Sequence, residues 1–191
     1  MNSGKPKMVI LADIGSLRVT CVGFKALLAD LSQNFEVVAC KFYSYVAKRN
    51  RDYNEFIAAY GYETYLPSAS RRRNKLDSRQ VITATEIANS NTMTGIGINA
   101  VAFITGEGDI LPVINLLKSK GIDVYELNVA KTKYSDVYSD FIQVPLTALR
   151  QGYTAPATKV KKAPKPVVAP AGPHDNQRLQ DVKNILSKYR K

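Results

Sequence analysis

Acidic side chains follow two apolar runs of this chain, an arrangement that suits divalent-metal chemistry. Asp13 comes directly after the apolar run 8–12. Glu107 and Asp109 stand in the glycine-rich turn that follows a second run, 101–104. In an open α/β sheet, ligands bind outside the carboxyl ends of the strands. If both runs are neighbouring strands, their acids face each other and can share a divalent metal.

The other residue types that carry chemistry restrict the alternatives. Cys21 and Cys40 lack a metal-binding spacing, and the only histidine is His174. A Cys/His zinc site is therefore close to excluded, and a histidine-based triad is disfavoured. We expect both cysteines to be buried thiols in a reducing cytoplasm rather than a disulfide. A nucleotide-binding regulator is the weakest hypothesis, because no GxGxxG or Walker pattern is present.

Apolar runs alternate with helical periodicities along the first 150 residues. Strands are predicted over 8–12, 36–46, 62–66, 100–105, 122–127 and 141–144. Helices are predicted from Ser16 as N-cap to Leu31, over 52–60, 78–89 and 109–120, and as one turn over 134–138, while 90–97 is predicted to be a loop. This alternation predicts an α/β fold, a parallel sheet of five or six strands flanked by helices on both faces.

The composition changes near residue 151 and divides the chain into three parts. We expect a domain over 1–150, a Pro/Ala/Lys-rich linker over 151–174 and a short amphipathic basic helix over 175–191. The net charge is +11, and residues 151–191 hold nine Lys/Arg against two Asp. Such a disordered basic tail indicates a polyanionic partner. The helix could also bind a protein partner, another copy of the chain, or the domain itself.

No membrane role is predicted. The chain has no apolar run near the ~20 residues that span a bilayer. The first residues have no signal-peptide core and run directly into the first predicted strand. We therefore expect a cytoplasmic protein.

Four segments, in order over roughly residues 7–145, resemble the NYN domain, a PIN-like nuclease group that includes the LabA-like proteins. They are the first strand with its Asp and turn (8–17), a Lys-spacer-Asp segment that opens a helix (75–77), a counterpart of the Ser-Gly-Asp-x-Asp-Phe motif (103–110), and the closing strand with its Ser-Asp…Asp-Phe-Ile ending (120–144). The resemblance implies a PIN-like, Rossmann-like sheet and a metal-dependent endoribonuclease.

The resemblance also implies a set of site residues. Asp13, Asp77 and Asp109 fall on acidic positions of the family, and Glu107 falls on the first Asp of the double-acid motif. These four are the candidate catalytic residues. Asp13 and Asp109 would bind Mg²⁺ or Mn²⁺ directly, and Asp77 and Glu107 would act through water or orient the nucleophile. Structural readings stay open: the three aspartates could be turn or helix-capping residues, and Glu107 a solvated turn acid.

Three departures from the family pattern support a second hypothesis. Ser16 stands where the family usually has Asn, Thr83 stands where a second helix acid is common, and Glu107 is one methylene longer than Asp. Mg²⁺ tolerates shifted ligands poorly. The alternative is therefore a catalytically weakened NYN-fold protein that binds RNA or acts as a scaffold, recruiting a partner through its C-terminal tail.

Candidate RNA-binding residues precede the Asp77 helix. Arg71, Arg72, Arg73 and Lys75 could grip a phosphate backbone, although a solvated charge run is an equal alternative. Ser16 could position a phosphate or a water. Six tyrosines between residues 43 and 65 lie among basic residues, a pattern that suits base stacking, but most of them are expected to be core or half-buried strand residues.

Overall fold

The computed structural model describes residues 4–67, 75–93, 95–106 and 108–151. All of them belong to one unit, Met1–Ala155. The predicted basic helix and all but the first residue of the predicted linker lie outside the described residues. The proposed three-part division of the chain therefore stays a prediction.

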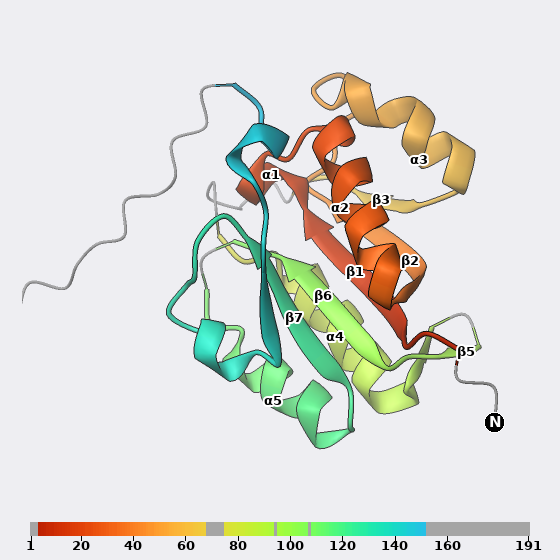
Figure 1. The fold of residues 1–191 in the computed structure, drawn as a ribbon, viewed down its shortest axis with the longest axis vertical. Helices are drawn as coiled ribbons and strands as arrows, with labels where there is room; N and C mark the ends of the chain where they lie inside the picture. Colours follow the sequence, from red (N-terminus) through yellow and green to blue (C-terminus); the bar gives the residue numbers. More distant parts are fainter. Residues whose placement is uncertain (1–3, 68–74, 94, 107, 152–191) are drawn as a thin grey trace, which may run out of the picture. The chain divides into compact units, whose positions relative to one another are not determined.

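A parallel sheet of six strands forms the centre of this unit (Figure 1). The strands are β1 (Lys7–Asp13), β2 (Glu36–Tyr43), β3 (Glu63–Tyr65), β6 (Ala100–Ile104), β7 (Asp123–Asn128) and β8 (Asp140–Gln143), in the order β3-β2-β1-β6-β7-β8. The order reverses at β1, so the carboxyl ends of β1 and β6 flank the point where such sheets bind ligands. The predicted α/β fold with a parallel sheet is confirmed.

Helices cover both faces of the sheet, with α2 in front of it and α4 behind it in Figure 1. One face carries α1 (Ile14–Leu17), α2 (Cys21–Asn34), α3 (Asn54–Tyr60) and the 3₁₀ turns η1 (Arg51–Tyr53) and η3 (Leu146–Ala148). The other carries α4 (Ser78–Ser90), α5 (Leu111–Ser119) and the 3₁₀ turn η2 (Ser135–Val137). The helices predicted over 52–60, 78–89 and 109–120 are confirmed within one or two residues.

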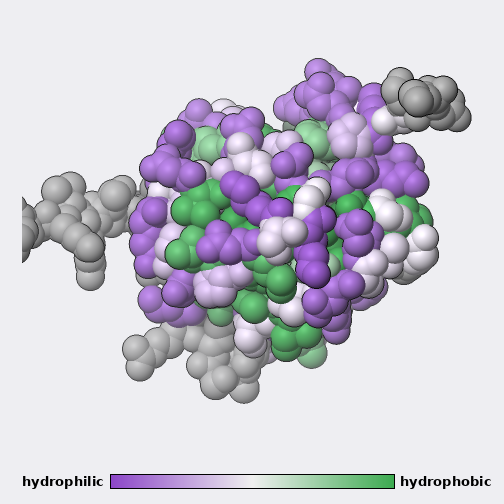
Figure 2. Space-filling model, turned by 90° about the horizontal axis from the view of Figure 1, so that it is seen from below, coloured by the Kyte–Doolittle hydropathy of each residue, from purple (hydrophilic) through white to green (hydrophobic). Residues whose placement is uncertain are grey.

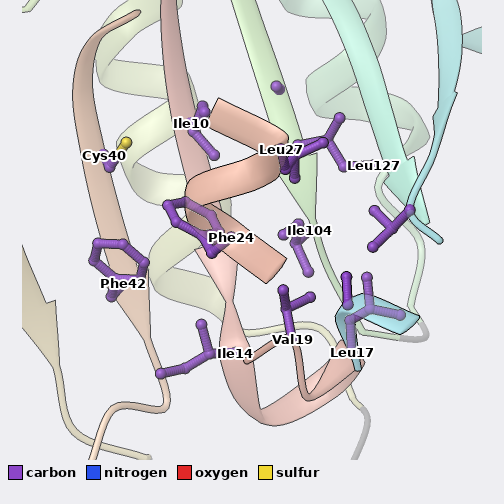
Figure 3. Packing of buried hydrophobic residues seen from close by; sticks show 14 of the residues in the cluster. Ile10, Ile14, Leu17, Val19, Phe24, Leu27, Cys40, Phe42, Ile104 and Leu127 are labelled. Atoms are coloured by element: carbon purple, nitrogen blue, oxygen red, sulfur yellow. The ribbon is translucent and has the colours of Figure 1, made fainter. Parts of the chain in front are cut away.

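Strand alternation divides the core into two clusters. In β1, Ile10 points into the cluster with α2, and Leu11 points into the cluster with α4 and α5. Figure 3 shows the first cluster, in which Phe24 of α2 packs edge-to-face on Phe42 of β2 with ring centroids 5.1 Å apart. Both faces of β1 are therefore buried, which accounts for its unbroken apolar sequence.

The start of the first helical segment differs from the prediction. Ser16 does not cap the long helix. Instead Asp13 caps the short α1, and Thr20 caps α2 by accepting a hydrogen bond from the Gly23 backbone N–H at 3.0 Å. Arg18 separates the two helices because its backbone is left-handed, with φ of 53°. Val22, in the first turn of α2, is exposed.

The segment predicted as a loop over 90–97 contains a short antiparallel pair, β4 (Thr92–Met93) with β5 (Ile96–Gly97). Asn91 ends α4 in the left-handed conformation, with φ of 53°. Its carbonyl then accepts a hydrogen bond from the Ile98 backbone N–H at 3.0 Å, which closes the segment. Two-residue strands carry too little periodicity to be predicted from sequence.

Figure 2 shows the molecule from below the view of Figure 1. On this face, hydrophilic residues surround and interrupt the hydrophobic ones. Among the described residues, no helix combines the length and apolar character needed to cross a membrane.

Both cysteines are free and buried, as predicted. Burial raises the pKa of the Cys40 thiol to about 12. Because only the thiolate is nucleophilic, we expect Cys40 in a Cys21→Ser variant to resist a thiol reagent at pH 8 and to react fully in urea. Reaction of the native variant at the rate of a free cysteine would contradict the packing described here.

Candidate functional site

The turn after β1 holds a buried carboxylate. Asp13 is fully buried, and its Oδ1 accepts a hydrogen bond from the Gly15 backbone N–H at 3.0 Å. The Ser16 hydroxyl donates to Oδ2 of Asp13 at 2.8 Å. Asp13 is thus an N-cap in this structure, and Ser16 fixes the orientation of its carboxylate. The metal-binding role expected for Asp13 stays a prediction.

The loop after β2 packs directly against this turn. A Cβ atom at Gly15 would lie 2.9 Å from Cβ of Ser44, so only glycine fits without a shift. Ser44 itself has a positive φ of 60°, an uncommon conformation for a residue with a side chain. Ser44 was not among the predicted site residues, because positive φ at a serine leaves no clear mark in the sequence.

The start of α4 holds a second buried carboxylate, paired with an arginine. Asp77 is 2% exposed and caps α4 by accepting from the Arg79 backbone N–H at 3.1 Å. The Arg79 side chain adds two bonds, from Nε to Oδ1 at 2.9 Å and from Nη2 to Oδ2 at 2.5 Å. Asp77 raises the pKa of Arg79, and the charge of Asp13 adds to this effect.

A fully buried glutamine joins α4 to the two central strands. The Gln80 Nε2 group donates to the Leu11 carbonyl at 3.0 Å and to the Ile104 carbonyl at 2.8 Å. Its Oε1 atom accepts from the Thr105 hydroxyl at 2.9 Å. Gln80 therefore fixes α4 across the point where the strand order reverses. Gln80 was not among the predicted site residues, although a polar residue one helical turn after Asp77 is a usable signal.

The loop after β6 reaches the start of α4. A Cβ atom at Gly108 would lie 2.5 Å from Cβ of Leu76, so the backbone at Gly108 packs closely against the Leu76 side chain. Asp109 follows in this loop; it is exposed, and its Oδ1 accepts from the Leu111 backbone N–H at 3.2 Å. The segments that carry Asp77 and Asp109 therefore adjoin each other.

Aromatic rings extend the site toward β2 and β3. Tyr43 stacks on Tyr65 with centroids 4.8 Å apart, and the Arg79 guanidinium lies 5.6 Å from the Tyr65 ring centroid. The Tyr43 hydroxyl donates to the buried Thr83 hydroxyl at 2.9 Å. Burial is the main reason why the pKa of Tyr43 is raised. Thr83, at the position where the family commonly has an acid, thus bonds a tyrosine.

A salt bridge extends this polar surface along the edge of the sheet. Lys41 pairs with Glu63 at 2.8 Å, and the Tyr65 hydroxyl donates to Glu63 at 2.9 Å. Lys41 is the main cause of the lowered pKa of Glu63. Of the six tyrosines considered for stacking, Tyr43 and Tyr53 are fully buried and Tyr60 is 66% exposed. The expectation that most belong to the core or are half-buried agrees with these values.

A further buried acid lies on β7, on the same face of the sheet as α4 and α5. Glu126 is 2% exposed and accepts a hydrogen bond from the Ser135 hydroxyl. The Ser135 Oγ accepts in turn from the Thr132 backbone N–H at 2.7 Å. We interpret Glu126 as a structural acid that fixes the loop between β7 and β8.

Several predicted site residues lie outside the described residues: Glu107, Arg71, Arg72 and Arg73. Lys75 is described and exposed. No observation tests the functional role of any predicted site residue, so all of these assignments stay predictions.

The described residues do not by themselves fit the metal centre that the resemblance implies. Among them, no three Asp, Glu, His or Cys side chains are grouped closely enough to hold a metal ion. Both oxygens of Asp77 bond the Arg79 guanidinium, and both oxygens of Asp13 accept hydrogen bonds. A metal bound at Asp77 would therefore compete with a positive charge already held there.

Comparison with known proteins identifies the domain and its fold. A family model described as the NYN domain matches residues 7–144. A crystal structure of a protein of unknown function from Vibrio parahaemolyticus is 19% identical with a TM-score of 0.57, and covers 78% of this chain and 99% of that one. At this identity the likeness shows the fold alone. No curated protein matches the chain.

Two oxidoreductase structures match more remotely. They come from Sinorhizobium meliloti and Thermotoga maritima, and each is 18% identical with a TM-score of 0.35. They cover 74% and 72% of this chain but 37% of their own lengths. Likeness at this level has no bearing on function.

The Gln80 bridge predicts a large effect on stability. Gln80→Leu keeps the side-chain size but removes the buried partners of two carbonyls and a hydroxyl. We expect the free energy of unfolding to fall by about 2–4 kcal/mol, measured by urea unfolding. Gln33→Leu, on the exposed side of α2, is the control and should change it by less than about 0.5 kcal/mol. Equal effects of the two substitutions would contradict the bridge.

Proposed function

Because this chain belongs to the NYN domain family, a PIN-like nuclease group, we propose that it binds RNA along the carboxyl edge of its sheet. One observation carries the proposal. The turn after β1, the start of α4 and the loop after β6 meet where the strand order reverses, which is the usual ligand position in such a sheet.

Charge and aromatic residues support RNA as the ligand. Arg79 and Lys41 flank the half-buried Tyr65 ring, with the Lys41 Nζ 5.9 Å from its centroid. Lys75 is exposed two residues before the Asp77 cap. Cations beside a nucleic acid neutralise phosphates, and their number sets the salt dependence of binding. In this proposal Ser16, Arg71, Arg72 and Arg73 add further phosphate contacts.

The basic tail completes the proposed function. Residues 151–191 carry most of the net charge of +11 and would raise RNA affinity or recruit a protein partner, including a second copy, through 175–191. The proposed setting is the cytoplasm.

A metal-dependent endoribonuclease is the second candidate. The buried Asp13 at the end of β1 favours it, as does the contact that brings the Asp109 loop to the Asp77 segment. Mg²⁺ or Mn²⁺ would supply an activated water and charge stabilisation at the phosphate. The described residues do not complete that site, so this candidate also requires Glu107.

RNA binding and RNA cleavage can be separated in one experiment. We expect the chain to bind labelled single-stranded or hairpin RNA in a gel-shift assay and to leave it uncut with Mn²⁺. The variant Asp13→Asn/Asp109→Asn should bind within about threefold of the wild type, because neither acid contacts RNA directly in this proposal. Cleavage that disappears in this variant would establish the endoribonuclease instead.

Removing the tail should change the salt dependence of binding. A chain shortened by residues 156–191 loses nine basic side chains. We expect weaker RNA binding and a shallower slope of log K against log salt, measured by fluorescence anisotropy. Unchanged affinity and slope would assign the tail to a protein partner.

A further inference from the structure

Arg79 is the cation that pairs with the buried Asp77 carboxylate. Its guanidinium bonds both oxygens of Asp77, and the charge of Asp13 also acts on it. The Arg79 side chain is 32% exposed, so solvent and ligands reach it. A positive charge is thus built into the polar edge by the chain itself.

The surroundings of Arg79 fix its geometry. The guanidinium lies over Tyr65, Tyr65 stacks on Tyr43 at an interplanar angle of 7°, and the Tyr43 hydroxyl is bonded to Thr83. A cation over an aromatic face is attracted by the ring, and a two-bond fork to a carboxylate adds directional strength. The side chain is therefore held in place before any ligand arrives.

Guanidinium chemistry suits a phosphate at this position. Arginine has five N–H donors, and the fork to Asp77 uses two of them. The others can donate to phosphate oxygens in the planar pairing that arginine favours. A divalent cation bound to the oxygens of Asp77 would compete with the Arg79 fork and would be repelled by the charge of the guanidinium.

We propose that Arg79 takes the place of the divalent cation, so that this edge binds an RNA phosphate without metal. The inference rests on the proposed RNA-binding function and specifies how that site recognises its ligand. It also explains why a threonine bonded to a tyrosine can stand at residue 83, where the family commonly has an acid: a site without metal needs no further carboxylate.

The test compares RNA binding with and without metal in the full chain. Binding of a labelled single-stranded RNA is measured in EDTA and in Mn²⁺ for the wild type, Arg79→Gln, Arg79→Lys and the control Lys120→Gln. Lys120 is exposed and lies between α5 and the amino end of β7, away from the carboxyl ends of the strands. Its replacement by glutamine removes one positive charge, as Arg79→Gln does. Thermal melting shows which variants remain folded.

We expect equal wild-type affinity in EDTA and Mn²⁺. Arg79→Gln should weaken RNA binding roughly tenfold, and Lys120→Gln should have little effect. The RNA affinity of Arg79→Lys should lie between those of the wild type and Arg79→Gln, because lysine keeps the charge but cannot form the two-bond fork. Wild-type binding that requires Mn²⁺, or an Arg79→Gln affinity equal to that of the wild type, overturns the inference alone. Absence of RNA binding in every condition overturns the proposed function and the inference with it.

A second measurement needs no RNA. If Arg79 excludes metal from Asp77, Arg79→Ala should bind Mn²⁺ at least roughly tenfold more tightly than the wild type, detected by electron paramagnetic resonance. The double variant Arg79→Ala/Asp77→Asn should lose this gain. Equal Mn²⁺ affinity in the wild type and Arg79→Ala overturns the inference even if Arg79→Gln fails to fold.

Discussion

The buried amide of Gln80 ties together the two strands between which the strand order reverses. By donating to the Leu11 and Ile104 carbonyls, it holds the start of α4 over the carboxyl ends of β1 and β6. Buried backbone carbonyls need hydrogen-bond donors. The Gln80 amide supplies them and, by the same contacts, positions the start of α4. Asp77 and Arg79 precede Gln80 in the same first turn, and their placement depends on this contact.

In the proposed function, the group that compensates the charge of Asp77 determines which ligands bind at the carboxyl ends of the strands. Asp77 is almost fully buried, and a buried carboxylate needs a positive partner. In a nuclease a metal can take this role, whereas here the Arg79 guanidinium takes it. The surrounding stack of Tyr65 on Tyr43 and the bond to Thr83 agree with one fixed cation. In the proposed function, the NYN fold is retained around a different local chemistry.

The sequence predicted the fold but not the side-chain contacts around the candidate site, for a physical reason. Unbroken apolar runs such as 8–12 and 101–104 are typical of strands that are buried on both faces. Strands of this kind occur in parallel sheets covered by helices, so the runs predict the sheet. The side-chain contacts of the site leave no such periodicity. The two-bond fork between Asp77 and Arg79 depends on rotamers, and Gln80 reaches strands far from it in the chain. The positive φ of Ser44 could not be predicted because a single backbone angle leaves no sequence pattern. The strands β4 and β5 could not be predicted because two residues are too few to show a periodicity.

The most direct test of this account is a crystal structure of the full chain grown with Mn²⁺ and a short single-stranded RNA. If Arg79 replaces the metal, a phosphate lies within hydrogen-bond distance of the Arg79 guanidinium, with the fork to Asp77 intact and no metal between them. A Mn²⁺ ion bound by Asp13 and Asp77, with Arg79 displaced, would contradict it and restore the metal-dependent nuclease as the function.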